Sequence, residues 1–252
     1  MSLQESLGHA LSLLEDGADI LDLGGMKAGP GRSVSEDEET DRVVPLIAAL
    51  RARTPAVLSV ETWRPGVAAA AIDAGASIVN DVSGLVNREI ADVCARSGAS
   101  LVLMHHGGQL RGRPRNPRYI DVVGSVLEDW GRLVALAGQH GVARSALIVD
   151  PGLDFGKTTF HSLELVRRMP ELLSAGLPLL VAPSRKDVVG ETLNLPLEQR
   201  LEGTLALVAL TVYLGAHIVR VHDVRAAART VAMVEAVTAR RPPVAPVRGL
   251  WE

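Results

Sequence analysis

Short apolar runs alternate with longer amphipathic segments along most of the chain. Each run is bounded by Gly or Pro within a few residues, which is typical of buried strands. The runs predict strands at Asp19–Leu23, Val57–Glu61, Ser77–Asp81, Ser100–His105, Leu147–Asp150, Leu179–Ala182 and Ile218–His222. Apolar residues at helical spacing predict helices between them, for example at Val67–Ala74, Ile120–His140 and Glu198–Leu214. The repeating unit is therefore a helix followed by a strand.

A recurring phrase, Gly-Ala-x-Ile, precedes three of these strands. It occurs at Gly17–Ile20, Gly75–Ile78 and Gly215–Ile218, and Gly98–Leu101 is a looser copy. Glycine tolerates the left-handed backbone that closes many helices, so the phrase predicts a helix end that feeds a buried strand. Successive parallel strands then require right-handed crossovers.

Seven such strands in 252 residues predict an α/β fold, a TIM (β/α)8 barrel with one strand unaccounted for. An open, doubly wound sheet is the alternative. We favour the barrel because polar residues follow nearly every strand, whereas an open sheet gathers them at one switch point. No linker or low-complexity segment divides the chain, so we expect one domain over residues 1–252.

The helix predicted at Leu3–Glu15 has no strand to precede it. In a seven-stranded ring, the strands at Asp19–Leu23 and Ile218–His222 would each pair on one side only. We therefore expect about 15–30 further residues, one strand and its loop, upstream of Met1. We expect the 252-residue chain by itself to be poorly stable, prone to aggregation and inactive.

Composition narrows the function classes. Charged residues make up 22% of the chain and the net charge is −3, which argues against binding to nucleic acid or an anionic membrane. No apolar run reaches the roughly 20 residues that span a bilayer, and the polar start is no signal peptide. We therefore expect a cytoplasmic protein. The single cysteine, Cys94, excludes an internal disulfide framework.

Polar residues collect at the carboxyl ends of the predicted strands, which open onto one face of a barrel. They are Asp22, Glu61, Asn80, Asp81, His105, Asp150, Ser184, Arg185, Lys186, Arg220, His222 and Asp223. The carboxylates of Glu61 and Asp150 can accept hydrogen bonds from ring N–H and amino groups of a planar heterocycle. Asn80 can donate and accept, and Lys186 can donate to a ring carbonyl.

A second kind of site is predicted at the last strand. Arg220 and His222 alternate along it and therefore point the same way. With the start of the following helix they predict an anion site. We interpret Asp22, Asp81 and Asp223 as loop or cap residues rather than ligands.

Several strings together resemble the dihydropteroate synthase family. They are GADILDLGG (17–25), SVETWR (59–64), GASIVNDVSG (75–84), LMHHGG (103–108), DPGLDFGKT (150–158), PSRKDVVG (183–190), RLEGTLA (200–206) and GAHIVRVHDV (215–224). The resemblance implies a TIM barrel that joins a pterin-CH2 pyrophosphate to 4-aminobenzoate and expels pyrophosphate, on the route to folate. It also implies Mg²⁺ as a cofactor and a homodimer.

The resemblance assigns the pterin pocket position by position. Asn80, Asp150 and Lys186 match residues that hold the pterin ring, and Asp150 and Lys186 would be catalytic. Glu61 stands where the family usually has Asp, so the carboxylate is kept with one more methylene. Loss of pyrophosphate would leave a pterin methyl cation, which the Asp150 carboxylate would stabilise.

The remaining substrate contacts follow in the same way. Phe155, Ser184 and Arg185, with Lys186, resemble the residues that flank the aminobenzoate channel. Arg220 and His222 resemble the pair that binds pyrophosphate.

Three departures from the family pattern leave the activity open. The first strand and its loop, with a metal-binding Asn, are absent from this chain, so its metal ligands are unknown. In the loop Met26–Gly31, Ala28 and Gly29 stand where the family has Thr and Arg, and Asp154 replaces a Gly. This pattern is similar to divergent second synthase-like paralogues of actinobacteria. The alternatives to a synthase are a pterin-binding paralogue with a regulatory or partner role, and a methyltransferase-type pterin domain.

Overall fold

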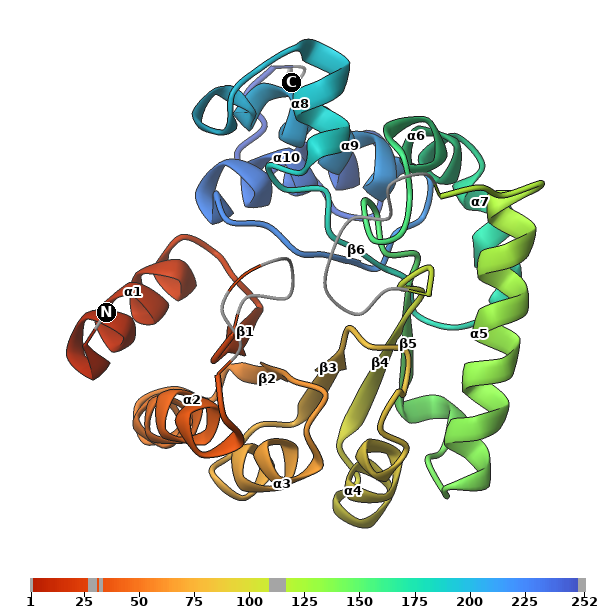
Figure 1. Cartoon of the computed structure of the whole chain (residues 1–252). Helices are drawn as coiled ribbons and strands as arrows, with labels where there is room; N and C mark the ends of the chain where they lie inside the picture. The colour runs from red at the N-terminus through yellow and green to blue at the C-terminus, as the bar shows by residue number, and fades with distance from the viewer. Residues whose placement is uncertain (1, 27–30, 32–33, 109–116, 249–252) are drawn as a thin grey trace.

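Seven parallel strands follow one another in chain order in the computed structural model, which describes residues 2–26, 31, 34–108 and 117–248. The strands are β1 (Ile20–Gly24), β2 (Val57–Glu61), β3 (Ile78–Asp81), β4 (Ser100–Met104), β5 (Leu147–Asp150), β6 (Leu180–Val181) and β7 (Ile218–Val219). β1 to β5 form one sheet and β6 pairs with β7, while a bridge from Val149 to Leu179 links the two groups. Figure 1 shows the strands curving round a common centre with helices outside them.

The helices alternate with the strands, as the repeating unit predicts. They are α1 (Leu3–Glu15), α2 (Glu36–Arg51), α3 (Pro65–Asp73), α4 (Glu89–Ser97), α5 (Val122–Gln139), α6 (Thr159–Arg167), α7 (Met169–Leu172), α8 (Asp187–Leu193), α9 (Leu201–Tyr213) and α10 (Val224–Val237). Gly17, Gly75, Gly98 and Gly215 all have positive φ, which confirms the left-handed helix ends. The predicted α/β barrel fold class is confirmed, with seven strands in the part of the chain that the structure describes.

The predicted bounds differ most from the structure in the last third of the chain, at β6, β7 and the helix between them. β6 and β7 are two residues long, shorter than the predicted Leu179–Ala182 and Ile218–His222. The predicted helix Glu198–Leu214 is a short 3-10 turn followed by α9. Arg200 lies at that joint, and its guanidinium donates to the carbonyls of Leu195 and Arg185.

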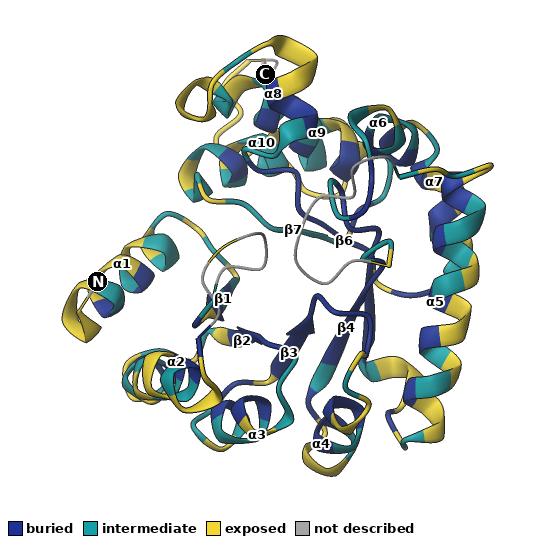
Figure 2. Ribbon diagram, in the orientation of Figure 1, coloured by how far each residue is buried: buried dark blue, intermediate teal, exposed yellow. Residues whose placement is uncertain are grey.

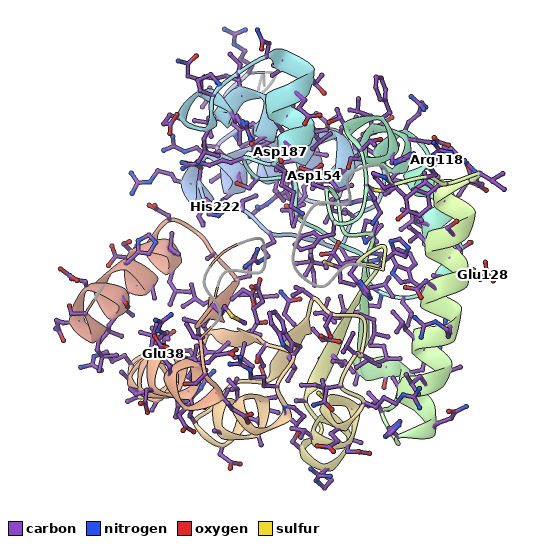
Figure 3. The ribbon with its side chains drawn as sticks, in the orientation of Figure 1. Glu38, Arg118, Glu128, Asp154, Asp187 and His222 are labelled. Atoms are coloured by element: carbon purple, nitrogen blue, oxygen red, sulfur yellow. The ribbon has the colours of Figure 1, made fainter. Side chains whose placement is uncertain are left out.

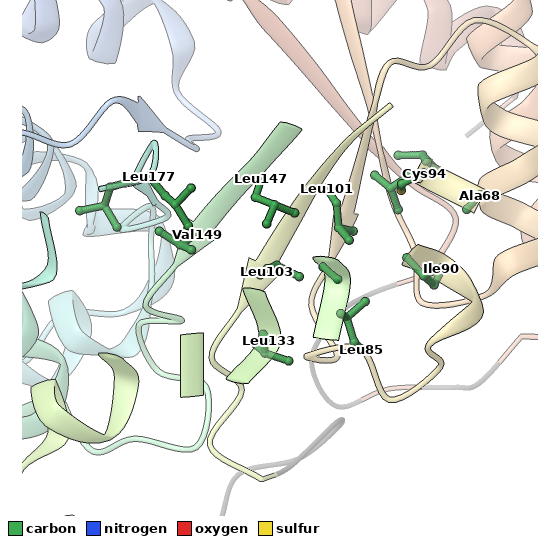
Figure 4. Packing of buried hydrophobic residues seen from close by; sticks show 14 of the residues in the cluster. Ala68, Leu85, Ile90, Cys94, Leu101, Leu103, Leu133, Leu147, Val149 and Leu177 are labelled. Carbon is green, nitrogen blue, oxygen red and sulfur yellow. The ribbon is translucent and has the colours of Figure 1, made fainter. Parts of the chain in front are cut away.

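The larger core cluster lies between the sheet and the helices (Figure 2), and a smaller one, with Ile78, Val102 and Ile148, lies on the other face of the strands. Leu101 and Leu103 of β4 and Leu147 of β5 pack close to Leu133 of α5, and all four are at most 1% exposed (Figure 4). Trp130 of α5 is also buried, and its indole N–H donates to the backbone carbonyl of Asp150 at 3.3 Å. This packing fixes the end of β5, where a site residue stands.

The two ends of the strand series face a common cleft. Within the residues described, β1 pairs with β2 alone and β7 with β6 alone. The cleft between them has a volume of about 1960 Å³ and is lined by residues of α1, β1, β7 and α10.

The expectation of further residues before Met1 stays a prediction, as does the single domain. In the described part of the chain no helix is long and apolar enough to cross a membrane.

Candidate functional site

The guanidinium of Arg220 lies between the carboxylates of Asp22 and Glu61, next to strands β1, β2 and β3. Arg220 Nε donates to Asp22 Oδ2 at 2.6 Å, and Arg220 Nη2 donates to Glu61 Oε2 at 2.8 Å. Asn80 Nδ2 donates to the same oxygen of Asp22 at 2.9 Å, and Ser59 Oγ donates to its other oxygen at 2.6 Å. The interpretation of Asp22 as a loop or cap residue is therefore wrong. Asp22 lies within β1 and accepts hydrogen bonds from three segments.

Burial and the opposite charges nearby shift the pKa values of Glu61 and Arg220. Glu61 is 8% exposed, and burial raises its pKa to about 7 against the opposing effect of Arg220. Burial lowers the pKa of Arg220, but the carboxylates of Asp22 and Glu61 outweigh that effect and hold it above its ordinary value. An anion entering the site must therefore compete with two carboxylates for this guanidinium.

A second group, Asp150 and Lys186, faces the cluster from β5 and the loop after β6. Burial raises the pKa of Asp150, while the ammonium of Lys186 lowers it. Lys186 Nζ donates to the carbonyl of Leu153 at 2.8 Å and lies 5.0 Å from the centroid of the Phe155 ring. Burial lowers the pKa of Lys186, and Asp150 opposes that shift. The site thus holds the buried carboxylate of Asp150 and the partly buried ammonium of Lys186, the latter beside an aromatic face.

One acceptor in the site has no hydrogen-bond partner in the described part of the chain. It is Oδ1 of Asn80, whose residue is 4% exposed. A buried amide oxygen without a donor is costly, so this oxygen is available to accept a hydrogen bond from a bound molecule or a water.

The loop between β5 and α6 is fastened by a lysine that sequence reasoning missed. Lys157 Nζ donates to the carbonyls of His105, Gly152 and Phe155 at 2.8–3.0 Å. Burial lowers the pKa of Lys157 to about 7. The signal was its place in DPGLDFGKT, but the three acceptors come from two loops and are invisible in the sequence.

The cleft is also lined by Ser184 and His222, and Arg185 follows Ser184 in the chain. Nδ1 of His222 lies 2.9 Å from Ser184 Oγ, and that hydroxyl also accepts from the backbone N–H of His222 at 3.1 Å. Arg185 donates twice to Asp223, at 2.9 and 2.6 Å. Arg220 and His222 thus take different partners, although both line the cleft. His222, labelled in Figure 3, lies two residues before the start of α10.

Asp81 and Asp223 are the other two aspartates that we interpret as loop or cap residues. Asp81 anchors a turn, as expected, because its carboxylate accepts from the N–H groups of Ser83 and Leu85. Asp223 stands before α10 without a side-chain capping bond, and its carboxylate pairs with Arg185. Asp223 therefore anchors a loop, which agrees with the loop-or-cap interpretation, but its side chain does not cap α10.

Two expectations from the family resemblance concern Mg²⁺ and the loop residues Ala28 and Gly29. No group of three or more His, Cys, Asp or Glu side chains that could hold a metal ion occurs in the part of the chain that the structure describes. Mg²⁺ stays a prediction of the family resemblance. Ala28 and Gly29 lie outside the described residues.

Comparisons with known proteins agree with this geometry. A family model described as "Pterin binding enzyme" matches residues 1–222, so the chain is one of the pterin-binding barrels. The chain belongs, more narrowly, to the dihydropteroate synthase family. It is 47% identical over 241 residues to "Inactive dihydropteroate synthase 2" of Mycobacterium tuberculosis (strain ATCC 25618 / H37Rv), covering 93% of this chain and 76% of the relative.

Relatives without the word "inactive" in their names are also similar. The chain is 40% identical over 238 residues to "Dihydropteroate synthase" of Bacillus subtilis (strain 168), covering 94% of this chain and 81% of the relative. The crystal structure of Yersinia pestis dihydropteroate synthase with a sulfonamide drug superposes with a TM-score of 0.92 and 36% identity. That match covers 95% of this chain and 87% of the other.

Proposed function

We propose that the chain binds a pterin between Glu61, Asn80 and Asp150. The observation that carries this proposal is the buried Oδ1 of Asn80, which lacks a donor among the described residues and stands at the same barrel end as the two carboxylates. A pterin offers ring N–H and amino groups to such acceptors and a carbonyl to the ammonium of Lys186. Membership of a pterin-binding family supports the same ligand.

The reaction we propose is transfer of the pterin methylene to the amine of 4-aminobenzoate. The bond between the methylene carbon and the pyrophosphate oxygen breaks, and its electron pair leaves with pyrophosphate. The amine nitrogen then forms the new C–N bond and loses a proton. Asp150 stabilises the positive charge on the pterin methylene, and Arg220 receives the leaving anion if its carboxylate partners release it.

A second candidate function is pterin binding without transfer. It is favoured by the guanidinium of Arg220, which Asp22 and Glu61 already hold at 2.6 and 2.8 Å. It is also favoured by the name of the 47% identical mycobacterial relative. In this candidate the pterin pocket is kept, and the group that would receive pyrophosphate is engaged elsewhere.

Turnover of the purified protein with pterin-CH2 pyrophosphate and 4-aminobenzoate separates the two candidates. Release of pyrophosphate that depends on both substrates supports the transfer reaction. Pterin binding by calorimetry without pyrophosphate release supports the second candidate and contradicts the first. Absence of both would contradict the whole proposal.

A further inference from the structure

Lys186 occupies an unusual place for a lysine, the N-cap of helix α8. The side chain of an N-cap residue ordinarily accepts a hydrogen bond from a backbone N–H of the first turn, and negative charge is favoured there. An ammonium has no acceptor and carries the wrong sign. Its Nζ points instead to the carbonyl of Leu153, next to the ring of Phe155. The start of α8 must therefore find its acceptor elsewhere.

Asp154 supplies that acceptor from a different segment. Its Oδ2 accepts from the backbone N–H of Val188, in the first turn of α8, at 3.1 Å. Its Oδ1 accepts from the hydroxyl of Ser162 in α6 at 3.0 Å, and its own N–H donates to that hydroxyl at 3.1 Å. Ser162 and Val188 are fully buried. Figure 3 labels Asp154 close to Asp187, the first residue of α8.

The backbone of Asp154 shows that these contacts outweigh a local cost. Its φ is +67°, in the left-handed region that favours glycine over other residues. An aspartate persists there when the surroundings compensate for the strain, and its two side-chain contacts to α6 and α8 do so.

We propose that Asp154 is a positioning residue that fixes the ammonium of Lys186 at the pterin site by joining the β5–α6 loop to the start of α8. Leu153 and Phe155, its two chain neighbours, are the residues that Lys186 touches. One residue thus holds both the helix that carries the lysine and the loop that receives it. This inference rests on the proposed pterin site for its functional consequence, but the joint itself is testable without any pterin.

The first measurement is amide hydrogen exchange on the wild type, Asp154→Gly, Asp154→Asn and Asp121→Ala. Asp121 is the matched control because it caps α5 from its own N-cap position, and its other partner, Arg168, lies at the opposite end of α6 from Ser162. In Asp154→Gly we expect the Val188 amide to exchange about tenfold faster than in the wild type. In Asp154→Asn it should stay near the wild type because the amide oxygen still accepts. In Asp121→Ala it should not change. Equal exchange of Val188 in the wild type and Asp154→Gly would overturn the proposal.

The second measurement is the affinity for a bare pterin by calorimetry, with thermal unfolding of the same samples. Glycine relieves the positive φ, so Asp154→Gly should keep a stability close to the wild type while its pterin affinity falls about 5–20-fold. A merely structural role would lower stability and leave affinity unchanged, as we expect of Asp121→Ala, and that result for Asp154→Gly would overturn the proposal. If the wild type itself binds no pterin, the proposed function fails, while the exchange of Val188 still decides whether the joint exists.

Discussion

Arg220 lies far along the chain from both of its carboxylate partners. Its contact with Asp22 spans 198 residues and its contact with Glu61 spans 159. The side chains of Asp22 and Glu61 are 15% and 7% exposed, whereas that of Arg220 is 40% exposed. The guanidinium therefore lies between the buried carboxylates and the cleft, on the side that solvent and ligands reach.

The raised pKa of Glu61 makes a prediction about pH. Burial raises it from 4.5 to about 7 in the folded state, so the folded protein binds more protons than the unfolded chain between these values. The stabilising contribution of this group is therefore present below 4.5 and is lost as the pH rises through about 7. In Glu61→Gln this loss is absent. Between about pH 5 and pH 8, the unfolding free energy of the wild type should fall relative to that of Glu61→Gln by on the order of 1–3 kcal/mol. Urea unfolding at several pH values measures it, and parallel curves for the two proteins would contradict it.

Removing Arg220 should affect both stability and substrate preference. Arg220→Ala leaves Asp22 and Glu61 without their cation, and because Arg220 is only half-buried we expect a loss of about 2–4 kcal/mol in unfolding free energy. Affinity for a pterin pyrophosphate should fall far more than affinity for the bare pterin, since guanidinium contacts phosphate oxygens. The control is Arg225→Ala, whose exposed side chain pairs with Asp16 on the surface and should cost less than about 1 kcal/mol. Equal losses for both pterin ligands would show that Arg220 has a structural role only.

At the scale of elements, the loop between β5 and α6 connects most of the site. Lys157 ties it to the end of β4, Asp154 ties it to α6 and α8, and the hydroxyl of Tyr119 donates to the carbonyl of Gly156 at 2.9 Å. The N–H of Gly152 donates to Asp150 Oδ1 at 2.7 Å, which orients that carboxylate. The loop is therefore held at several points beside the proposed pterin site.

Gly152 and Gly98 form a matched pair for testing this loop. Both have positive φ, +63° and +74°. A Cβ on Gly152 would lie 2.2 Å from the carbonyl oxygen of His105, whereas a Cβ on Gly98 would meet nothing within 4 Å. Gly98→Ala should cost about 1 kcal/mol from the backbone alone, and Gly152→Ala about 3 kcal/mol or more. Urea unfolding compares the two, and equal costs would mean that the loop yields freely.

The order of elements could be predicted from the sequence, because hydrophobic periodicity and glycine helix ends are local signals. The strands at Val57–Glu61 and Leu147–Asp150 and the helix at Leu3–Glu15 agree with the structure to the residue. The roles of Asp22, Lys157 and Asp154 could not be predicted, because their partners come from distant segments and carry no local pattern. The positions of Asn80, Asp150 and Lys186 at one barrel end followed from strand polarity alone.

Among the described residues, the middle strands are paired on both sides, whereas β1 and β7 are each paired on one side only. β4 pairs with β3 and β5, while β1 and β7 each border the cleft. Openings of the structure should therefore begin at the cleft.

Native-state hydrogen exchange tests this distribution of stability. Amides of β3 and β4 should exchange most slowly, and those of β1 and β7 should exchange at least about tenfold faster, because one side of each marginal strand lacks a neighbour among the described residues. Uniform protection from β1 to β7 would contradict the prediction.

The most direct test of the pterin site is calorimetric titration of the wild type and Asp150→Asn with a pterin. Loss of the buried carboxylate should weaken binding by about 2–4 kcal/mol, because charge-assisted hydrogen bonds are removed. The fold should survive, since a buried neutral amide is less costly than a buried carboxylate. Asp73→Asn, on the exposed surface of α3, is the control and should bind like the wild type. The account predicts binding by the wild type and the control with a large loss in Asp150→Asn, and equal affinity in all three proteins would contradict it.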